Sequence, residues 1–337
     1  MTLFHGTGIK RKNILVLLVA CVLGIGGLSL PALAEEDDIP EPLRSGDWRY
    51  QVLEDGTIGI YRYCGQDEEL TVPEALEGKK VTSIGRMAFL ANHYLKSVVV
   101  PEDVTSIEEY AFCMCRNLSA VSLPDSLTKI AGGAFQDCRA LESIQIPDSV
   151  MEIEGNPFIL CNVLSKIIVS SEHPYLEIKD GVLFSKPDQK LICYPCTLPA
   201  KEYSIPQGTR MIANGAFFFA LRLTDITIPD SVISIGKDAF CRCDRLTEIA
   251  VPDSVTWIDE GAFAHCPVLK RVVLPQNITS ISKRLFFTCP ELTDITIPEH
   301  VVSIGDYAFF GCEKLTSLTI PDSVTDIGPD AFKKSFY

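Results

Sequence analysis

Cysteine is the side chain whose type and spacing could do chemistry in this sequence. The chain has 13 cysteines, and a thiol can act as a nucleophile, a disulfide partner or a metal ligand. Seven recur at one place of a 23-residue repeat: Cys115, Cys138, Cys161, Cys243, Cys266, Cys289 and Cys312. Since cysteine is small and often buried, this spacing favours a structural ladder in a core. Disulfides or metal binding are the alternative, because stacked positions lie near enough to bridge, although seven thiols cannot all pair with one another.

The remaining cysteines are less regular. Cys113 and Cys241 stand two residues before members of the ladder, and we expect them to be partly exposed. Cys193 and Cys196 form a C-x-x-C motif. A thioredoxin-like motif would open a helix, and a zinc site would need two more ligands at a similar spacing; the sequence shows neither. The motif is therefore structural, a local disulfide in an oxidising compartment, or a redox or metal site, in that order.

Other reactive groups are scattered. His93, His173, His265 and His300 fall at unrelated places in the repeat, so nothing brings two of them to one face. No nucleotide-binding loop, catalytic triad or pair of catalytic carboxylates is visible. An Asp-Ser pair follows many of the prolines, which is turn chemistry more often than a calcium site. We therefore expect no catalytic residue, no metal site and no cofactor.

These side chains must be positioned by the repeat itself. A phenylalanine recurs every 23 residues except across one gap of 59 residues, at positions 89, 112, 135, 158, 217, 240, 263, 286, 309 and 332. A proline runs in parallel, and each of nine prolines is followed six residues later by an isoleucine. Such a period is the signature of a solenoid, in which each unit buries its apolar side against its neighbours.

One unit shows how a coil is built. In residues 246–252 alternate apolar side chains predict a strand, and Pro252 ends it because proline cannot donate a ladder hydrogen bond. Asp253-Ser254 predicts a turn, and Val255 with Ile258 predicts a second inward-facing segment on the opposite wall. Gly261-Ala262-Phe263 predicts a tight helical turn, with the phenylalanine filling the coil.

Two segments break the period. Residues 47–80 contain Asp55-Gly56 between apolar runs, which predicts a β-hairpin cap for the exposed first coil. Residues 171–205 contain two apolar runs around a polar turn, which predicts an inserted hairpin. The repeats then form a first block, residues 81–170, and a second block, residues 206–337.

The N-terminus is typical of an export signal. Three cations at positions 10–12 precede an apolar run, and Ala32-Leu33-Ala34 fits a signal peptidase site followed by acidic residues. We predict a signal peptide over residues 1–34, cleaved after Ala34, and an acidic linker over residues 35–46. A lipoprotein signal at Cys21 and an uncleaved membrane anchor are the alternatives. The mature chain would then be secreted or at the cell surface, with no membrane span.

Composition limits the partners. The chain of 337 residues carries a formal net charge of −14. This charge argues against nucleic acid, because phosphate binding needs a basic surface. With 47% hydrophobic and 22% charged residues, the composition is that of a folded chain and not of a disordered one. We expect the protein to be a monomer.

The unit L-x-x-I-x-I-P-x-S-V-x-x-I-G-x-x-A-F-x-x-C resembles the BspA-type leucine-rich repeat, also called the Treponema pallidum type. The resemblance covers about residues 70–337, with clean units at 95–158 and 206–332. It implies a right-handed leucine-rich-repeat superhelix of parallel strands and short helical turns. It also implies an exported or cell-surface protein, as most members of this family are. Characterised members act as adhesins or protein-binding modules, so the resemblance implies a binding role as well.

The best candidate for function is therefore a surface. Outward positions on the main strands would form a broad face rich in Thr and Ser, with a basic island at Lys270-Arg271. The candidate binding residues are Lys96, Ser97, Glu142, Gln145, Thr224, Asp225, Thr247, Glu248, Lys270, Arg271, Thr293, Asp294, Thr316 and Ser317. Threonine could equally be present for its strand propensity alone.

The sequence thus predicts an adhesin-like, non-catalytic protein that binds a protein or cell-surface polymer of unknown identity. A structural spacer of the cell envelope without a ligand is the first alternative. A thiol-active protein that uses Cys193 and Cys196 is the weaker one.

Overall fold

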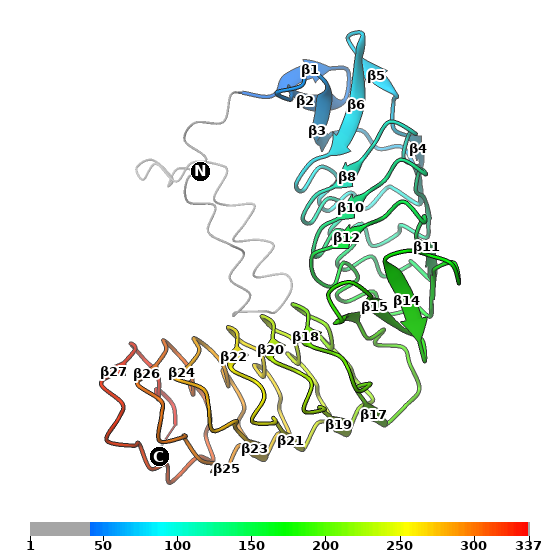
Figure 1. The fold of residues 1–337 in the computed structure, drawn as a ribbon. Helices are drawn as coiled ribbons and strands as arrows, with labels where there is room; N and C mark the ends of the chain where they lie inside the picture. Colours follow the sequence, from blue (N-terminus) through cyan, green and yellow to red (C-terminus); the bar gives the residue numbers. More distant parts are fainter. Residues whose placement is uncertain (1–40, 336–337) are drawn as a thin grey trace, which may run out of the picture. The chain divides into compact units, whose positions relative to one another are not determined.

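The computed structural model describes residues 41–335. Two compact units divide the chain, residues 1–41 and residues 42–337, and the description below concerns the second. The predicted signal peptide and most of the predicted acidic linker lie outside the described residues. The rest of the chain is a β-solenoid (Figure 1), as the period predicts.

Most coils contribute one short strand to each of two walls. The main wall contains β4 (Glu69–Thr71), β7 (Ser97–Val99), β9 (Ala120–Ser122), β11 (Ser143–Gln145), β13 (Lys166–Ile168), β17 (Glu202–Ser204), β19 (Asp225–Thr227), β21 (Glu248–Ala250), β23 (Arg271–Val273) and β25 (Asp294–Ile295). The second wall contains β6 (Lys79–Ile84), β8 (Ser106–Ile107), β10 (Lys129–Ile130), β12 (Glu152–Ile153), β18 (Met211–Ile212), β20 (Ser234–Ile235), β22 (Trp257–Ile258), β24 (Ser280–Ile281), β26 (Ser303–Ile304) and β27 (Asp326–Ile327). Where these strands pair they are parallel and, beyond the cap, one 23-residue repeat apart, as Ile130 with Ile153.

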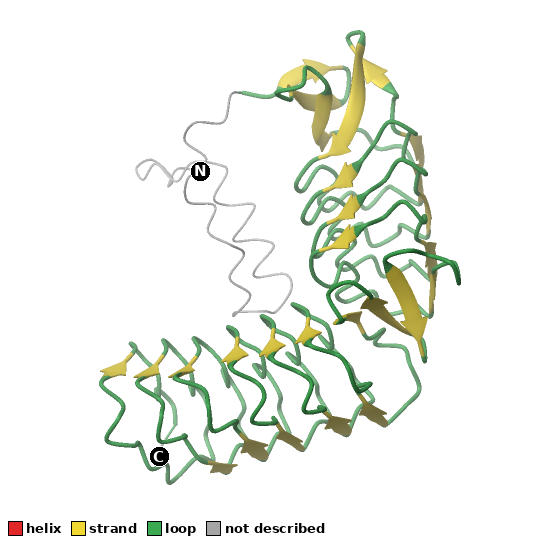
Figure 2. Cartoon of the chain, viewed as in Figure 1, coloured by secondary structure: helices red, strands yellow, loops and turns green. Residues whose placement is uncertain are grey.

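The third side of each coil is a turn and not the predicted short helix. Figure 2 shows strands and turns but no helix in the described residues. Around every marker phenylalanine except Phe158, the residues two before and two after it have positive φ, as at Tyr110 (58°) and Met114 (62°) around Phe112. Because left-handed and right-handed backbone conformations alternate along the turn, successive N–H groups donate alternately to a carbonyl of the same turn and to a carbonyl of the next coil. Phe112 donates to the Ala134 carbonyl and Met114 to the Gln136 carbonyl, each at 2.7 Å. This alternation prevents a helix, since a helix needs right-handed φ throughout.

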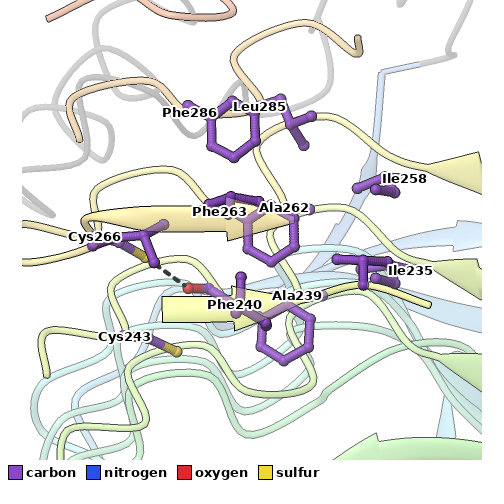
Figure 3. Packing of buried hydrophobic residues seen from close by; sticks show 14 of the residues in the cluster. Ile235, Ala239, Phe240, Cys243, Ile258, Ala262, Phe263, Cys266, Leu285 and Phe286 are labelled. Atoms are coloured by element: carbon purple, nitrogen blue, oxygen red, sulfur yellow. Dashed lines mark hydrogen bonds between the residues drawn. The ribbon is translucent and has the colours of Figure 1, made fainter. Parts of the chain in front are cut away.

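The core is a ladder of stacked rings. Consecutive marker phenylalanines from Phe89 to Phe158 and from Phe217 to Phe332 have centroids 4.7–5.9 Å apart. Figure 3 shows the rings of Phe240, Phe263 and Phe286 one above the other. Stacking at this separation follows from the coil repeat, and it excludes water from the centre of the solenoid. At the N-terminal end, Trp48 and Tyr63 pack on Phe89.

The predicted cap and insertion are both β-structures. In the cap, β1 (Leu43–Ser45), β2 (Trp48–Val52) and β3 (Ile58–Tyr63) form an antiparallel sheet, and β3 continues into the second wall through β6. The short strand β5 (Ala75–Leu76) pairs with β6. The insertion consists of the antiparallel strands β14 (Leu176–Lys179), β15 (Val182–Ser185) and β16 (Lys190–Cys193), and β16 pairs with β18 of the second block.

The insertion separates two hydrophobic cores. All four residues of β15 are buried, because the strand presents one face to each core. Leu183 belongs to the core of the first block, whereas Val182 and Phe184 belong to the core of the second. Tyr194 directly follows β16, stacks on Phe217 at 5.3 Å and takes the place of a marker phenylalanine. The gap of 59 residues is therefore bridged by a modified coil that closes both stacks.

Candidate functional site

The predicted binding residues lie on the exposed side of the main wall. In β21 and β23 the outer residues are exposed and the central one is buried, so Glu248 and Arg271 point away from the core. The side chains Lys96, Glu142, Gln145, Asp225, Thr247, Lys270, Thr293 and Asp294 are also exposed, whereas Ser97 and Thr224 are half-buried. Thr316 and Ser317 are exposed too, but the last coil forms no strand at this place of the main wall. The structure thus aligns most of the predicted residues along one wall.

Several of the hydroxyls on this wall serve the fold. The side-chain oxygens of Thr224 and Thr293 donate to the carbonyl oxygens of Lys201 and Lys270 in the preceding coil, at 3.1 and 3.3 Å. Ser119 makes the same contact with Lys96 at 3.1 Å. These hydroxyls extend the ladder between coils, so the richness in Thr and Ser is explained in part by structure.

In the second block, the main wall also carries charged side chains on neighbouring strands. Glu202 lies opposite Asp225 on neighbouring strands, which places like charges side by side. Two strands beyond Asp225 on the same wall, Arg271 lies between Glu248 and Asp294, and its Nε is 3.1 Å from an Asp294 carboxylate oxygen. Because both side chains are more than half exposed, this ion pair contributes little stability. It leaves a regular row of charges facing solvent.

The ladder cysteines have a hydrogen-bonding role that the sequence analysis missed. Each thiol donates to the carbonyl oxygen of the marker phenylalanine in the preceding coil, at 3.0–3.4 Å. Figure 3 shows this bond from Cys266 to Phe240. In the last coil Ser335 replaces cysteine and its hydroxyl donates to Phe309. A small donor that is otherwise apolar fits this buried position, which accounts for the repeated cysteine.

The other cysteines differ from expectation in one respect. Cys113 and Cys241 are 2% and 1% exposed, so the prediction that they are partly exposed is wrong. Cys193 is buried and Cys196 half-buried, and both are free cysteines in the structure. Burial raises the pKa of both thiols, which opposes thiolate chemistry at neutral pH. The local disulfide stays a prediction for the oxidised chain.

Thiol alkylation of the folded, reduced chain tests this environment. We expect iodoacetamide to modify the exposed Cys64 quickly at pH 8, because this thiol is accessible to solvent. Cys193 should react at least about a hundredfold more slowly, since burial both blocks access and keeps the thiol protonated. Peptide mass spectrometry over time measures the two rates in one sample. Equal rates would contradict the structural interpretation and favour a thiol-active motif.

The histidines remain dispersed. His173 is buried, its Nε2 lies 3.0 Å from the Pro147 carbonyl oxygen, and its Nδ1 accepts the backbone N–H groups of Tyr175 and Leu176. It therefore ties the start of the insertion to the first block. Within residues 41–335 no group of three or more His, Cys, Asp or Glu side chains is placed to hold a metal ion. Nor does this part of the chain contain a helix long and apolar enough to cross a membrane.

Two features escaped the sequence analysis. Asp137 is fully buried in a turn and its carboxylate accepts from the Nε atoms of Arg116 and Arg139, at 2.8 and 2.6 Å. Trp257 is 53% exposed on the second wall. For Trp257 the sequence signal was a departure from serine, the commonest residue at that place in the repeat. The place of Asp137 carries a different residue in every unit, so the repeat gave no signal there.

Comparisons with known proteins agree with this architecture. A leucine-rich repeat protein from Eubacterium ventriosum is 24% identical over 86% of this chain and 93% of its own, with a TM-score of 0.66. The pneumococcal vaccine antigen PcpA is 20% identical over 88% of this chain and 86% of its own, with a TM-score of 0.52. Both likenesses establish the fold alone. No curated protein matches the chain.

The family model for the BspA type leucine rich repeat region matches residues 60–186 and 202–337, in six copies. The two matched ranges leave out only the N-terminus and a short piece around the end of the insertion. The repeat unit, the two walls and this match together lead to one conclusion: the chain belongs to the BspA-type leucine-rich repeat family.

Proposed function

We propose that this chain is an exported, adhesin-like protein that binds a protein or a cell-surface polymer through the main wall of its second block, without catalysis. Membership of a leucine-rich repeat family supports a binding role, because solenoids offer extended faces for recognition. The observation that carries the proposal is the row of exposed charges at Glu248, Arg271 and Asp294, with Lys270 beside it.

This row is suited to recognition because it is independent of the core. The inward residues Ile249 and Val272 are almost fully buried and are aligned by the backbone ladder. The outward side chains can vary at little cost in stability, since surface substitutions are usually nearly neutral. Opposite charges at a fixed strand spacing of about 4.8 Å favour a partner whose own charges alternate, and such complementarity governs specificity and association rate.

The envelope spacer remains the rival. It accounts for the hydroxyl ladder and the acidic pair at Glu202 and Asp225, but it gives no reason for the basic island. The thiol-active alternative is weakened by the burial of Cys193 and by the raised pKa of its thiol.

A binding screen with residues 35–337 tests the proposal. The ligands are immobilised extracellular-matrix proteins, host cell surfaces and bacterial envelope fractions, and the variant is Lys270→Glu with Arg271→Glu. The matched control, Arg210→Glu with Lys283→Glu, reverses two exposed charges near the second wall of the same block. We expect saturable binding that weakens at least about tenfold in the first variant, as for a recognition hot spot, and is kept in the second.

Two outcomes would count against this interpretation. Equal loss in both variants would indicate an effect of net charge and not of the main wall. Absence of saturable binding to every ligand would favour the spacer.

A further inference from the structure

Trp257 is an unusual residue at its position on the second wall. The residue before the inward isoleucine is serine in several coils, including the neighbours Ser234 and Ser280, but here it is tryptophan. Trp257 is the partner of Ser234 across the β20–β22 ladder and is 53% exposed. Among the described residues no ring contact holds the indole, and the residues at its place in both adjoining coils, Ser234 and Ser280, are small.

The β-ladder opens next to this ring. The pairing order of the second wall runs β18–β20–β22 and then starts again at β24–β26–β27, so β22 and β24 are not paired. Elsewhere the equivalent backbone bonds are made: Thr256 donates to Ile233 at 3.0 Å, and Val302 to Thr279 at 2.9 Å. In the described chain no such bond joins the Thr279 N–H to the Thr256 carbonyl.

The opening is supported by side chains at its edges. The hydroxyl of Ser282 donates to the Ile258 carbonyl, where other coils use a backbone N–H. Asn277 Nδ2 donates to the Asp253 carbonyl at 2.9 Å. A donor and an acceptor of the backbone are thus left beside an exposed indole. Among the described strands of the second wall in the second block, this is the one place where neighbouring coils do not pair.

The chemistry around the ring selects the ligand. Its neighbours on the same wall include four uncharged hydroxyl side chains, Ser234, Thr256, Thr279 and Ser280, beside Ile233 and the acidic Asp259. A pyranose ring has an apolar face of weakly positive C–H groups that fits the negative face of an indole. Its hydroxyls at the ring edge would meet serine and threonine hydroxyls and the unpaired backbone groups.

We propose that Trp257 and the opening between β22 and β24 form a stacking subsite for a sugar ring of a neutral cell-surface polysaccharide. This subsite lies on the second wall and does not depend on the charges of the main wall, so it stands or falls separately from the function proposed above. An apolar protein segment is the other occupant to consider. It is less suited, because an apolar segment needs several apolar contacts. In the adjoining coils Ile233, at 38% exposed, offers a single large one, and the hydroxyl neighbours are small and polar.

Affinity gel electrophoresis tests the subsite. Residues 35–337 are run through native gels that contain dextran, laminarin or yeast mannan, with Trp257→Ala as the variant. Met151→Ala is the matched control, because Met151 lies on the second wall of the first block and is exposed to the same degree, 51%. Since both side chains are half exposed, both variants should keep the unfolding midpoint of the parent.

We expect at least one polysaccharide to retard the parent and Met151→Ala equally. Trp257→Ala should need a polysaccharide concentration at least about tenfold higher for the same retardation. The polysaccharide should also shift the tryptophan emission of the parent, with the residual signal of Trp48 unchanged in Trp257→Ala. No retardation by any of the three glycans, or equal retardation of all variants, would overturn the proposal. Loss of protein binding alone in Trp257→Ala would assign the surface to a protein partner and would also overturn it.

Discussion

Replacing Asp137 with alanine is expected to lower the free energy of unfolding by about 2–3 kcal/mol, because a buried carboxylate that satisfies two arginines is lost. Asp137 is fully buried, whereas the side chains of Arg116 and Arg139 are 29% and 50% exposed. The arginines can regain water after the substitution, which keeps the cost below that of a pair buried on both sides. Urea unfolding followed by circular dichroism measures the change.

Backbone geometry must be separated from charge in this experiment. Asp137 has a φ of 58°, a conformation that costs alanine about 1 kcal/mol but glycine almost nothing. Asp137→Gly therefore removes the carboxylate without adding strain, and it should still be destabilised. Asp125→Ala, at an exposed turn, should change little. A chain with Asp137→Gly as stable as the parent would show that the two ion pairs do not stabilise the turn.

The solenoid could be predicted from the sequence because its cause is periodic. The phenylalanine, proline and isoleucine registers each mark a residue that meets the same neighbours in every coil, so one unit defines all of them. The strands over residues 248–250 and 257–258 follow directly from this period. The hairpin insertion was visible for the same reason, since it interrupts the registers.

The turn could not be predicted, because its conformation is set by hydrogen bonds between coils. Gly261 is an ordinary left-handed residue, but Tyr110, Arg284 and Tyr307 occupy the same place with φ of 55–58°. In most turns three N–H groups bond to the next coil, and this gain outweighs the local preference of the side chains. A single unit, read by its own propensities, indicates a helix instead.

The candidate site was predicted only in outline. The outward positions of the main wall follow from strand alternation, and their exposure was correct for Glu248 and Arg271. Neither the pairing of Arg271 with Asp294 nor the opening beside Trp257 follows from alternation. Both depend on which coils are neighbours and on whether those neighbours are hydrogen-bonded, which the period alone does not determine.

The cysteine ladder shows how structure and chemistry are separated in this fold. A thiol that donates to a buried carbonyl needs to be protonated, and burial keeps it so by raising the pKa, as for Cys115 and Cys243. The same burial removes these thiols from redox chemistry.

Phe263→Ala is expected to cost about 4 kcal/mol of unfolding free energy, because a large buried ring is replaced by a cavity that the coils cannot fill. Phe263 is 0% exposed and lies between Phe240 and Phe286, at 5.4 and 5.7 Å. Phe263→Leu should cost less than half as much, since it keeps most of the volume. Phe332→Ala should also cost less, because this ring is only partly buried at the last described coil.

The location of the damage is the sharper test of Phe263→Ala. Coils of a solenoid are stabilised mainly by their neighbours, and the insertion places the rings of the two blocks in separate cores. Hydrogen exchange should therefore accelerate in the turns around Phe240, Phe263 and Phe286, while the turns around Phe112 and Phe135 keep their protection. Equal acceleration in both blocks would show that β15 and β16 transmit the loss, and that the two cores unfold as one unit.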